Sequence, residues 1–282
     1  MWSQWNGRTH SESLRFGQDV RRYLVYRPAK LERRPALVIN LQAAGGNGSV
    51  QEGFTRFDAQ ADRLGWLVAY PDAAAHGWTA FGCCKHAGVD DMTFIAKMID
   101  HLQATDGVDP NRVYVTGWSR GGMMSYRVAC ELSSQVAAIA AVSGNMADAS
   151  GNAYGPACSP ARPVSVLAIN GRADPEVPID GGRSRVTKED VVYSPMRDVL
   201  ERWRQLDGCA SFETTSVSGP VTVASWACRQ GSGVTSVVID GAGHSWPGAP
   251  LVNPPGASSA SVDGSRLIAD FFASHRRGAM HG

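Results

Sequence analysis

Apolar runs and helical repeats alternate along most of this chain. Continuous apolar runs predict strands covered on both faces at 35–42, 66–70, 113–116, 136–142 and 164–170. Apolar residues at helical spacing predict helices over 54–64, 92–102, 120–132, 195–206 and 266–275. Strands are also predicted at 221–228 and 235–239, and at 22–28, where bulky residues alternate as in an antiparallel strand. This alternation predicts a mainly parallel sheet with helices on both faces.

The same pattern favours one domain. Residues 1–20 are polar with no clear period, so we expect an N-terminal polar segment at 1–20 and the domain at 21–277. A chain of 282 residues could form one large α/β domain or two small ones. The sequence contains no internal repeat or linker, and 43% hydrophobic residues suffice for a substantial core.

Charge and hydropathy exclude some partners. The formal net charge is +1 and the arginine pairs are isolated, so we expect no nucleic-acid partner. No apolar run reaches the roughly 18 residues that span a membrane. Residues 1–7 have neither the charged nor the apolar region of a secretory signal, so either the protein is cytoplasmic or the numbering begins after a removed leader.

The cysteines bear on that choice. There are six, at Cys83, Cys84, Cys130, Cys158, Cys209 and Cys228. Fifteen pairings are possible and the spacing does not choose among them. Adjacent Cys83 and Cys84 would form a strained ring. We favour Cys209 with Cys228, and Cys83 and Cys84 with Cys130 and Cys158 in some order, which would imply an oxidising compartment and a removed leader. Buried free thiols are the alternative.

Candidate chemistry begins at Gly117-Trp-Ser-Arg-Gly121, which follows a predicted strand and precedes a predicted helix. This is the context of a G-x-S-x-G nucleophile elbow, in which a Cβ at either glycine would crowd the bend. A chain with 31 glycines can produce such a pentapeptide by chance, but Ser119 is the only serine with glycine both two before and two after. We therefore expect a serine hydrolase with Ser119 as nucleophile.

A serine nucleophile needs a base and a group that orients the base. In α/β-hydrolases these follow in the order serine, acid, histidine, each after a strand. His244 follows the strand at 235–239, and Asp174 follows the strand at 164–170, so we expect them to be base and acid. Glu176 and Asp180 are alternative acids, and a structural loop histidine or a surface aspartate are the non-catalytic interpretations.

Acyl transfer also needs two donors for the oxyanion. The backbone N–H of Arg120 is one candidate. The other is the N–H of Ala43 or Ala44, in the small-residue loop after the strand that ends at Gln42. An ordinary glycine-rich turn is the alternative for this loop.

Together these motifs resemble the polyhydroxybutyrate depolymerase and feruloyl-esterase-like group of secreted α/β-hydrolases. The elbow of this group resembles residues 117–123, and a block upstream of the elbow resembles residues 89–91 with Phe94. Its acid loop is similar to residues 158–163 leading to 171–178 and 181–182, and its histidine loop is similar to residues 243–248. The similarity covers about residues 20 to 275, and the six cysteines fall where the group tends to have them. It implies an α/β-hydrolase fold with Ser119, Asp174 and His244 as the triad. The group commonly has His-Gly where this chain has Gln42-Ala43.

Three tryptophans, Trp78, Trp118 and Trp246, could line the cleft and stack on an aromatic acyl group, with Gln42 a further substrate-binding candidate. Core packing is the alternative for each tryptophan. Asp90 and Asp91 lie near His86 in the sequence, but the spacing is not that of a metal site, so we expect a helix cap and a salt bridge. No metal or cofactor is expected.

The sequence thus predicts a cofactor-free, monomeric carboxylic ester hydrolase that works through an acyl-enzyme. Feruloyl or other aromatic-acyl esters of plant polysaccharide are one candidate substrate class, and short hydroxyalkanoate polyesters are the other. The alternatives are a peptidase or acyltransferase on the same fold, or a non-catalytic binding member. A complete Ser–Asp–His set argues against the last.

Overall fold

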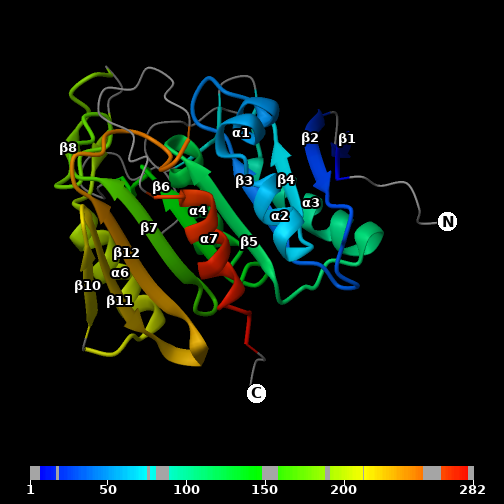
Figure 1. Cartoon of the computed structure of the whole chain (residues 1–282). Helices are drawn as coiled ribbons and strands as arrows, with labels where there is room; N and C mark the ends of the chain where they lie inside the picture. Colours follow the sequence, from blue (N-terminus) through cyan, green and yellow to red (C-terminus); the bar gives the residue numbers. More distant parts are fainter. Residues whose placement is uncertain are drawn as a thin grey trace.

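The computed structural model describes residues 7–16, 19–74, 77–80, 89–147, 158–187, 191–211, 213–249 and 262–278. A ten-stranded sheet in the order β1-β2-β4-β3-β5-β6-β7-β12-β11-β10 runs through the molecule (Figure 1). Its strands are β1 (Arg8–Phe16), β2 (Asp19–Arg27), β3 (Leu37–Leu41), β4 (Leu67–Pro71), β5 (Val113–Trp118), β6 (Ala138–Val142), β7 (Ser165–Gly171), β10 (Thr214–Ser218), β11 (Val221–Ala227) and β12 (Gly233–Ile239). Pairing is parallel from β4 to β12 and antiparallel at both ends of the sheet, which confirms the predicted, mainly parallel sheet. A separate ribbon joins β8 (Gly182–Arg183) to β9 (Val192–Tyr193).

Helices cover both faces of the sheet, as predicted (Figure 1). They are α1 (Gly48–Thr55), α2 (Asp58–Leu64), α3 (Asp91–Asp106), α4 (Arg120–Glu131), α6 (Met196–Asp207) and α7 (Gly264–Ala273), with a short 3₁₀ turn η1 (Arg229–Gly231). The core on the face of α3, α4 and α6 includes Phe94, Met124 and Trp203. The core on the other face includes Phe57 of the turn before α2 and Phe272 of α7. None of the described helices is both long and apolar enough to cross a bilayer.

The two outermost strands differ from the sequence prediction. β1 forms within residues 1–20, which we expected to lie outside the domain, and it pairs with β2 along its whole length. The sheet therefore begins at Arg8, not at residue 21. β10, which was also missed, is exposed along its length. Edge strands have one solvated side and carry few apolar residues, so the hydrophobic pattern does not reveal them.

The helix predicted at 54–64 is two helices. Arg56 has a left-handed backbone, with φ 49°, and its N–H bonds to the carbonyl of Glu52 to end α1. α2 begins two residues later and ends at Gly65, which is also left-handed. The apolar spacing continues across the break because both helices present their apolar residues to the same core.

Two disulfides are described. Cys209–Cys228 joins the segment after α6 to the end of β11, with Cα atoms 3.7 Å apart, and confirms that prediction. Cys130–Cys158 joins α4 to the segment before β7, so the expected pairing of Cys130 and Cys158 with Cys83 and Cys84 is wrong. A hydrogen bond of 2.9 Å from the N–H of Ala161 to Ser133 Oγ shows that the two segments lie side by side. Cys83 and Cys84 lie outside the described residues.

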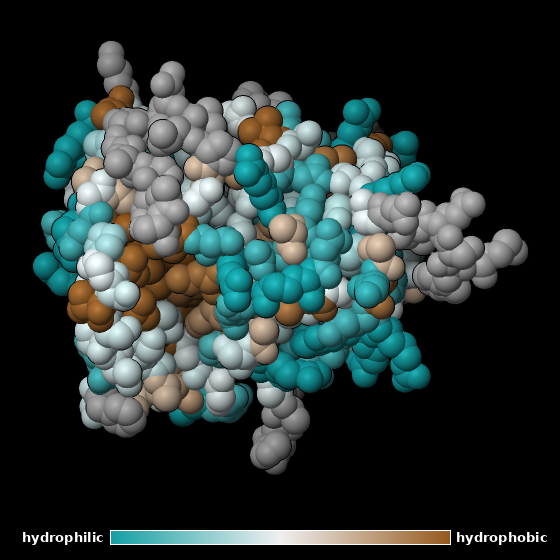
Figure 2. All heavy atoms as spheres, viewed as in Figure 1, coloured by the Kyte–Doolittle hydropathy of each residue, from teal (hydrophilic) through white to brown (hydrophobic). Residues whose placement is uncertain are grey.

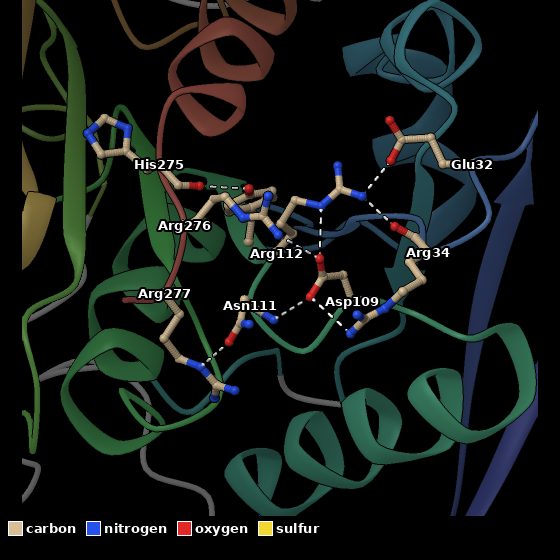
Figure 3. A network of polar contacts seen from close by, with 9 residues as sticks. Glu32, Arg34, Asp109, Asn111, Arg112, His275, Arg276 and Arg277 are labelled. Carbon is tan, nitrogen blue, oxygen red and sulfur yellow. Dashed lines mark hydrogen bonds and ion pairs between the residues drawn. The ribbon is translucent and has the colours of Figure 1, made fainter. Parts of the chain in front are cut away.

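A polar network holds the C-terminal segment against the start of β5 (Figure 3). Asp109, just before β5, pairs with Arg276 at 2.9 Å, Arg34 at 3.5 Å and Arg112 at 3.4 Å. Burial opposes ionisation of Asp109, but the N–H of Asn111 and the three arginines outweigh it and hold the pKa of Asp109 below its ordinary value. This network lies at the N-terminal end of β5, opposite the end that leads into the elbow.

One face of the molecule carries an apolar hollow beside α7 (Figure 2). Its lining includes Val221 at the start of β11, Val262, and Leu267 of α7. Asp263, Arg266 and Asp270 add charged side chains to the lining, and the carbonyl of Val262 lies close to Gly248 at the end of the histidine loop.

Candidate active site

Ser119 lies in the turn between β5 and α4, as the elbow motif predicts. Its backbone has φ 55° and ψ −117°, a conformation that costs a non-glycine residue free energy. The N–H of Ser119 bonds to the carbonyl of Val142 at 2.9 Å, and its carbonyl accepts the N–H of Met123 at 2.9 Å. Neighbouring backbone thus holds Ser119 in this strained turn.

Close packing explains the two glycines of the elbow. A Cβ on Gly117 would lie 2.5 Å from the carbonyl carbon of Gly121, and a Cβ on Gly121 would overlap the carbonyl oxygen of Leu41. The predicted crowding is therefore present at both positions. It also brings the first turn of α4 against the end of β3, where the small-residue loop begins.

Asp174 and His244 follow the neighbouring parallel strands β7 and β12. His244 Nδ1 lies 2.9 Å from Asp174 Oδ2, and the side chains are 5% and 0% exposed. The other oxygen of Asp174 accepts the N–H groups of Glu176 and Val177 at 2.8 and 2.9 Å. With the carboxylate oriented in this way, we assign the Nδ1 proton to the bond with Asp174, which leaves Nε2 as the basic nitrogen.

The elbow and the histidine loop meet at one place. The ring of Trp118, next to Ser119 in the sequence, lies 5.5 Å from the ring of His244 between centroids. Ser143, directly after β6, donates its hydroxyl to the carbonyl of Ser245 at 3.2 Å. The loops that follow β5, β6, β7 and β12 therefore converge at the C-terminal edge of the sheet, where open α/β sheets bind ligands.

Neither of the two alternative acids faces His244 Nδ1. Glu176 Oε2 is 3.3 Å from His244 Nε2, the nitrogen that does not face Asp174, and its side chain is 29% exposed. Asp180 is exposed on the next turn. The structure therefore brings Asp174, and not Glu176 or Asp180, to Nδ1. The sequence did not predict that Glu176 lies at Nε2. The only indication in the sequence was that a second carboxylate follows Asp174 by two residues.

The loop after β3 is held by polar contacts. Trp78 donates its indole N–H to the carbonyl of Gln42 at 3.2 Å. The Gln42 amide donates to the carbonyl of Gly46 at 2.7 Å, and the N–H of Gly46 bonds to the carbonyl of Ala43 at 3.2 Å. The loop that carries Ala43 and Ala44 thus lies beside the first turn of α4, whose first residue is Arg120. The two candidate donor segments are neighbours, as an oxyanion site requires.

The tryptophans divide into two kinds. Trp78 and Trp246 are 0% and 1% exposed, and Trp246 donates its indole N–H to Ser265 Oγ at 3.0 Å. Both are core residues, so our expectation that they contact substrate is not met. Trp118 is half-buried and its ring lies 4.6 Å from that of Phe54. Phe54 was not predicted for the site. The sequence marks it only as one of the apolar residues of α1.

Asp90 and Asp91 have the predicted structural roles. Asp90 caps α3 by accepting the N–H of Thr93 at 2.9 Å, and Asp91 pairs with Arg21 at 2.9 Å. Within the described ranges, no group of three or more His, Cys, Asp and Glu side chains could hold a metal ion. His86 lies outside those ranges.

Comparison with known proteins supports the assignment of the fold and identifies the family. Feruloyl esterase B of Piromyces equi is 28% identical over 76% of this chain and 40% of its own length. A bifunctional acetylxylan esterase/xylanase of Neocallimastix patriciarum is 26% identical over 81% of this chain and 31% of its own length, so the chain spans less than half of either relative. The structure of an acetyl xylan esterase from Aspergillus awamori superposes with a TM-score of 0.65 at 17% identity, over 94% of this chain and 99% of that one, which confirms the α/β-hydrolase fold. Residues 21–200 match the family described as esterase PHB depolymerase, and because they make up more than half of the chain, this protein belongs to that family.

Proposed function

We propose that this protein is a carboxylic ester hydrolase with Ser119 as nucleophile, His244 as base and Asp174 as the orienting acid. The observation that carries the proposal is the buried contact of 2.9 Å between His244 Nδ1 and Asp174 Oδ2, beside the strained elbow of Ser119. The pair lies on loops that follow adjacent strands, and the ring of Trp118 joins the elbow to His244. Membership in an esterase family supports the same reaction class.

The reaction takes place in two halves. His244 Nε2 accepts the hydroxyl proton of Ser119 as Oγ attacks the ester carbonyl, and the imidazolium then gives that proton to the departing alcohol. The N–H of Arg120 and an N–H of Ala43 or Ala44 stabilise the tetrahedral oxyanion. Water then attacks the acyl-enzyme with His244 as base again, which releases the acid and restores Ser119. The N-terminus of α4, at Arg120, is the positive end of the helix dipole and also stabilises the negative charge of the oxyanion.

Carbohydrate esters are the substrate class that we favour over hydroxyalkanoate polyesters. The relatives named above are a feruloyl esterase and an acetylxylan esterase, and both names refer to esters found on plant polysaccharide. The half-buried ring of Trp118, packed against Phe54 and His244, is the aromatic surface available to an acyl group.

Two disulfides within the described residues support folding in an oxidising compartment, and we propose that the protein is secreted. We also propose that it acts as a monomer without a cofactor. Mass analysis with and without a reductant tests the disulfides, and light scattering at assay concentration tests the monomer.

Hydrolysis of p-nitrophenyl acetate and butyrate tests the mechanism. Ser119→Ala should lower kcat by about 10⁴-fold or more, since the residues of a triad act as a unit. Ser216→Ala, on the exposed strand β10, is the matched control and should keep full activity. Activity that survives Ser119→Ala would overturn the mechanism. A folded wild-type protein without activity on any ester would instead favour a binding role.

A further inference from the structure

The second carboxylate at the histidine is not used by the triad. Glu176 Oε2 lies 3.3 Å from His244 Nε2, the nitrogen that must accept and return the proton. Its side chain is 29% exposed, whereas those of His244 and Asp174 are 5% and 0% exposed. Glu176 is thus the carboxylate at the open side of the histidine ring.

The position of Glu176 is well defined by its backbone. Its N–H and that of Val177 both bond to Asp174 Oδ1, at 2.8 and 2.9 Å. The carbonyl of Pro175 accepts the N–H of Arg185 at 2.7 Å, and Val177 is buried. The turn that carries Glu176 is therefore held by the same aspartate that orients His244, and its side chain is partly exposed beside Nε2.

Reaction geometry places the leaving alcohol next to this carboxylate. The alcohol oxygen must come within about 2.6–3.2 Å of Nε2 to receive the proton. Glu176 Oε2 lies 3.3 Å from the same nitrogen, so the carboxylate and the leaving oxygen are neighbours at Nε2 when the ester bond breaks. An ionised carboxylate only accepts hydrogen bonds. It therefore stabilises an alcohol with further hydroxyl donors, and repels one that carries its own carboxylate.

We propose that Glu176 is a specificity-determining residue for the alcohol side of the ester, and that it selects esters of polyhydroxyl alcohols such as sugars. The hydroxyl next to the ester donates to Glu176 without proton transfer, while Nε2 protonates the leaving oxygen. Esters of simple alkyl alcohols lack this donor, and a hydroxy acid released from the acid end of a hydroxyalkanoate chain brings a second negative charge. This inference rests on the proposed function and deepens it by naming the alcohol that the site selects.

The test keeps the acyl group constant and changes only the alcohol. A monoacetylated methyl xyloside, ethyl acetate and 3-acetoxybutyrate are hydrolysed by wild type and by Glu176→Ala, with acid release measured in a pH-stat. The wild type should prefer the xyloside. Glu176→Ala should lower the ratio of kcat/KM for the xyloside to that for ethyl acetate by about tenfold, the size expected for one hydrogen bond to a charged group. Each ratio comes from one enzyme preparation, so partial unfolding does not affect it.

Two more variants sharpen the result. Glu176→Gln keeps an acceptor without the charge, so it should retain part of the xyloside preference and gain activity on 3-acetoxybutyrate. Glu213→Gln, exposed beside β10, should leave every ratio unchanged. Equal ratios in wild type and Glu176→Ala, or an equal rise on all three esters, would overturn the role of Glu176. These outcomes leave the proposed function intact as long as Ser119→Ala remains inactive, so the two failures are distinguishable.

Discussion

Asp174 uses its two carboxylate oxygens for different partners. Oδ2 faces His244 Nδ1 at 2.9 Å, and Oδ1 accepts the N–H groups of Glu176 and Val177. One fully buried side chain therefore orients the proposed base and shapes the turn that carries Glu176. A change at Asp174 should affect both.

Asp174→Asn should lower kcat on p-nitrophenyl butyrate by about 10³–10⁴-fold, because an amide has only one acceptor oxygen. If that oxygen keeps the N–H groups of Glu176 and Val177, the amide NH2 donates to His244 Nδ1 and the ring proton moves to Nε2, which can then no longer act as base. Asp180→Asn is the matched control, since Asp180 is exposed and was one of the two alternative acids. It should keep wild-type kcat. A large loss in Asp180→Asn together with a small one in Asp174→Asn would contradict the assigned acid.

Gly121→Ala should abolish most activity. The added Cβ would overlap the carbonyl oxygen of Leu41 and lie 2.7 Å from that of Gln42, so the elbow must separate from the end of β3. A shift of about 1 Å between nucleophile and oxyanion donors is expected to cost about a hundredfold in kcat. Gly53→Ala, in α1 with no atom within 4 Å of the added Cβ, should keep kcat and stabilise the fold by about 0.5–1 kcal/mol. Esterase assays and urea unfolding measure the two effects.

Trp78→Phe removes the indole N–H that bonds to the carbonyl of Gln42, and with it one support of the loop of Ala43 and Ala44. We expect kcat to fall about tenfold, less than the loss expected for removing an oxyanion donor itself. Trp203→Phe is the control: Trp203 is equally buried, but its indole N–H has no partner among the described residues. Both variants should lose stability, by about 1–3 kcal/mol. Equal kcat in the two would show that Trp78 acts only through packing.

Asp207, at the end of α6, should make stability depend on pH. Burial raises its pKa to about 7. Hydrogen bonds from the N–H of Val164 and from the Ser232 side chain, and the positive charge of Arg229, partly offset this effect. Because the folded pKa exceeds the unfolded value of about 3.9, the contribution is complete below about pH 4 and is lost as pH rises to about 7. Asp207→Asn should therefore raise the free energy of unfolding at pH 8 by a few kcal/mol, and raise it little at pH 4.

Urea unfolding at both pH values measures this difference. Asp198→Asn, whose side chain is 59% exposed on the same helix, is the control and should change stability little at either pH. A gain in Asp207→Asn that is the same at pH 4 and pH 8 would mean that the buried charge is not its cause.

Local features of this protein could be predicted from the sequence. The elbow depends on a strand, a tight turn and a helix that are consecutive in the chain, so glycine spacing and apolar pattern suffice to place Ser119 in such a turn. Strand order along the chain then leads to Asp174 and His244, since each follows an apolar run. Those runs identify only strands that are buried on both faces. For this reason the edge strand β1 and the exposed β10 were missed.

Tertiary structure decided what depends on distant segments. The pairing of Cys130 with Cys158 follows from α4 packing beside the segment before β7, a contact without local signal. Packing also buries Trp78 and Trp246, whereas Trp118 remains half-buried next to His244. Glu176 was recognisable only as one of three nearby carboxylates. Which nitrogen of His244 each carboxylate reaches depends on how the loops after β7 and β12 fold over the sheet edge, and sequence distance carries no information about that geometry.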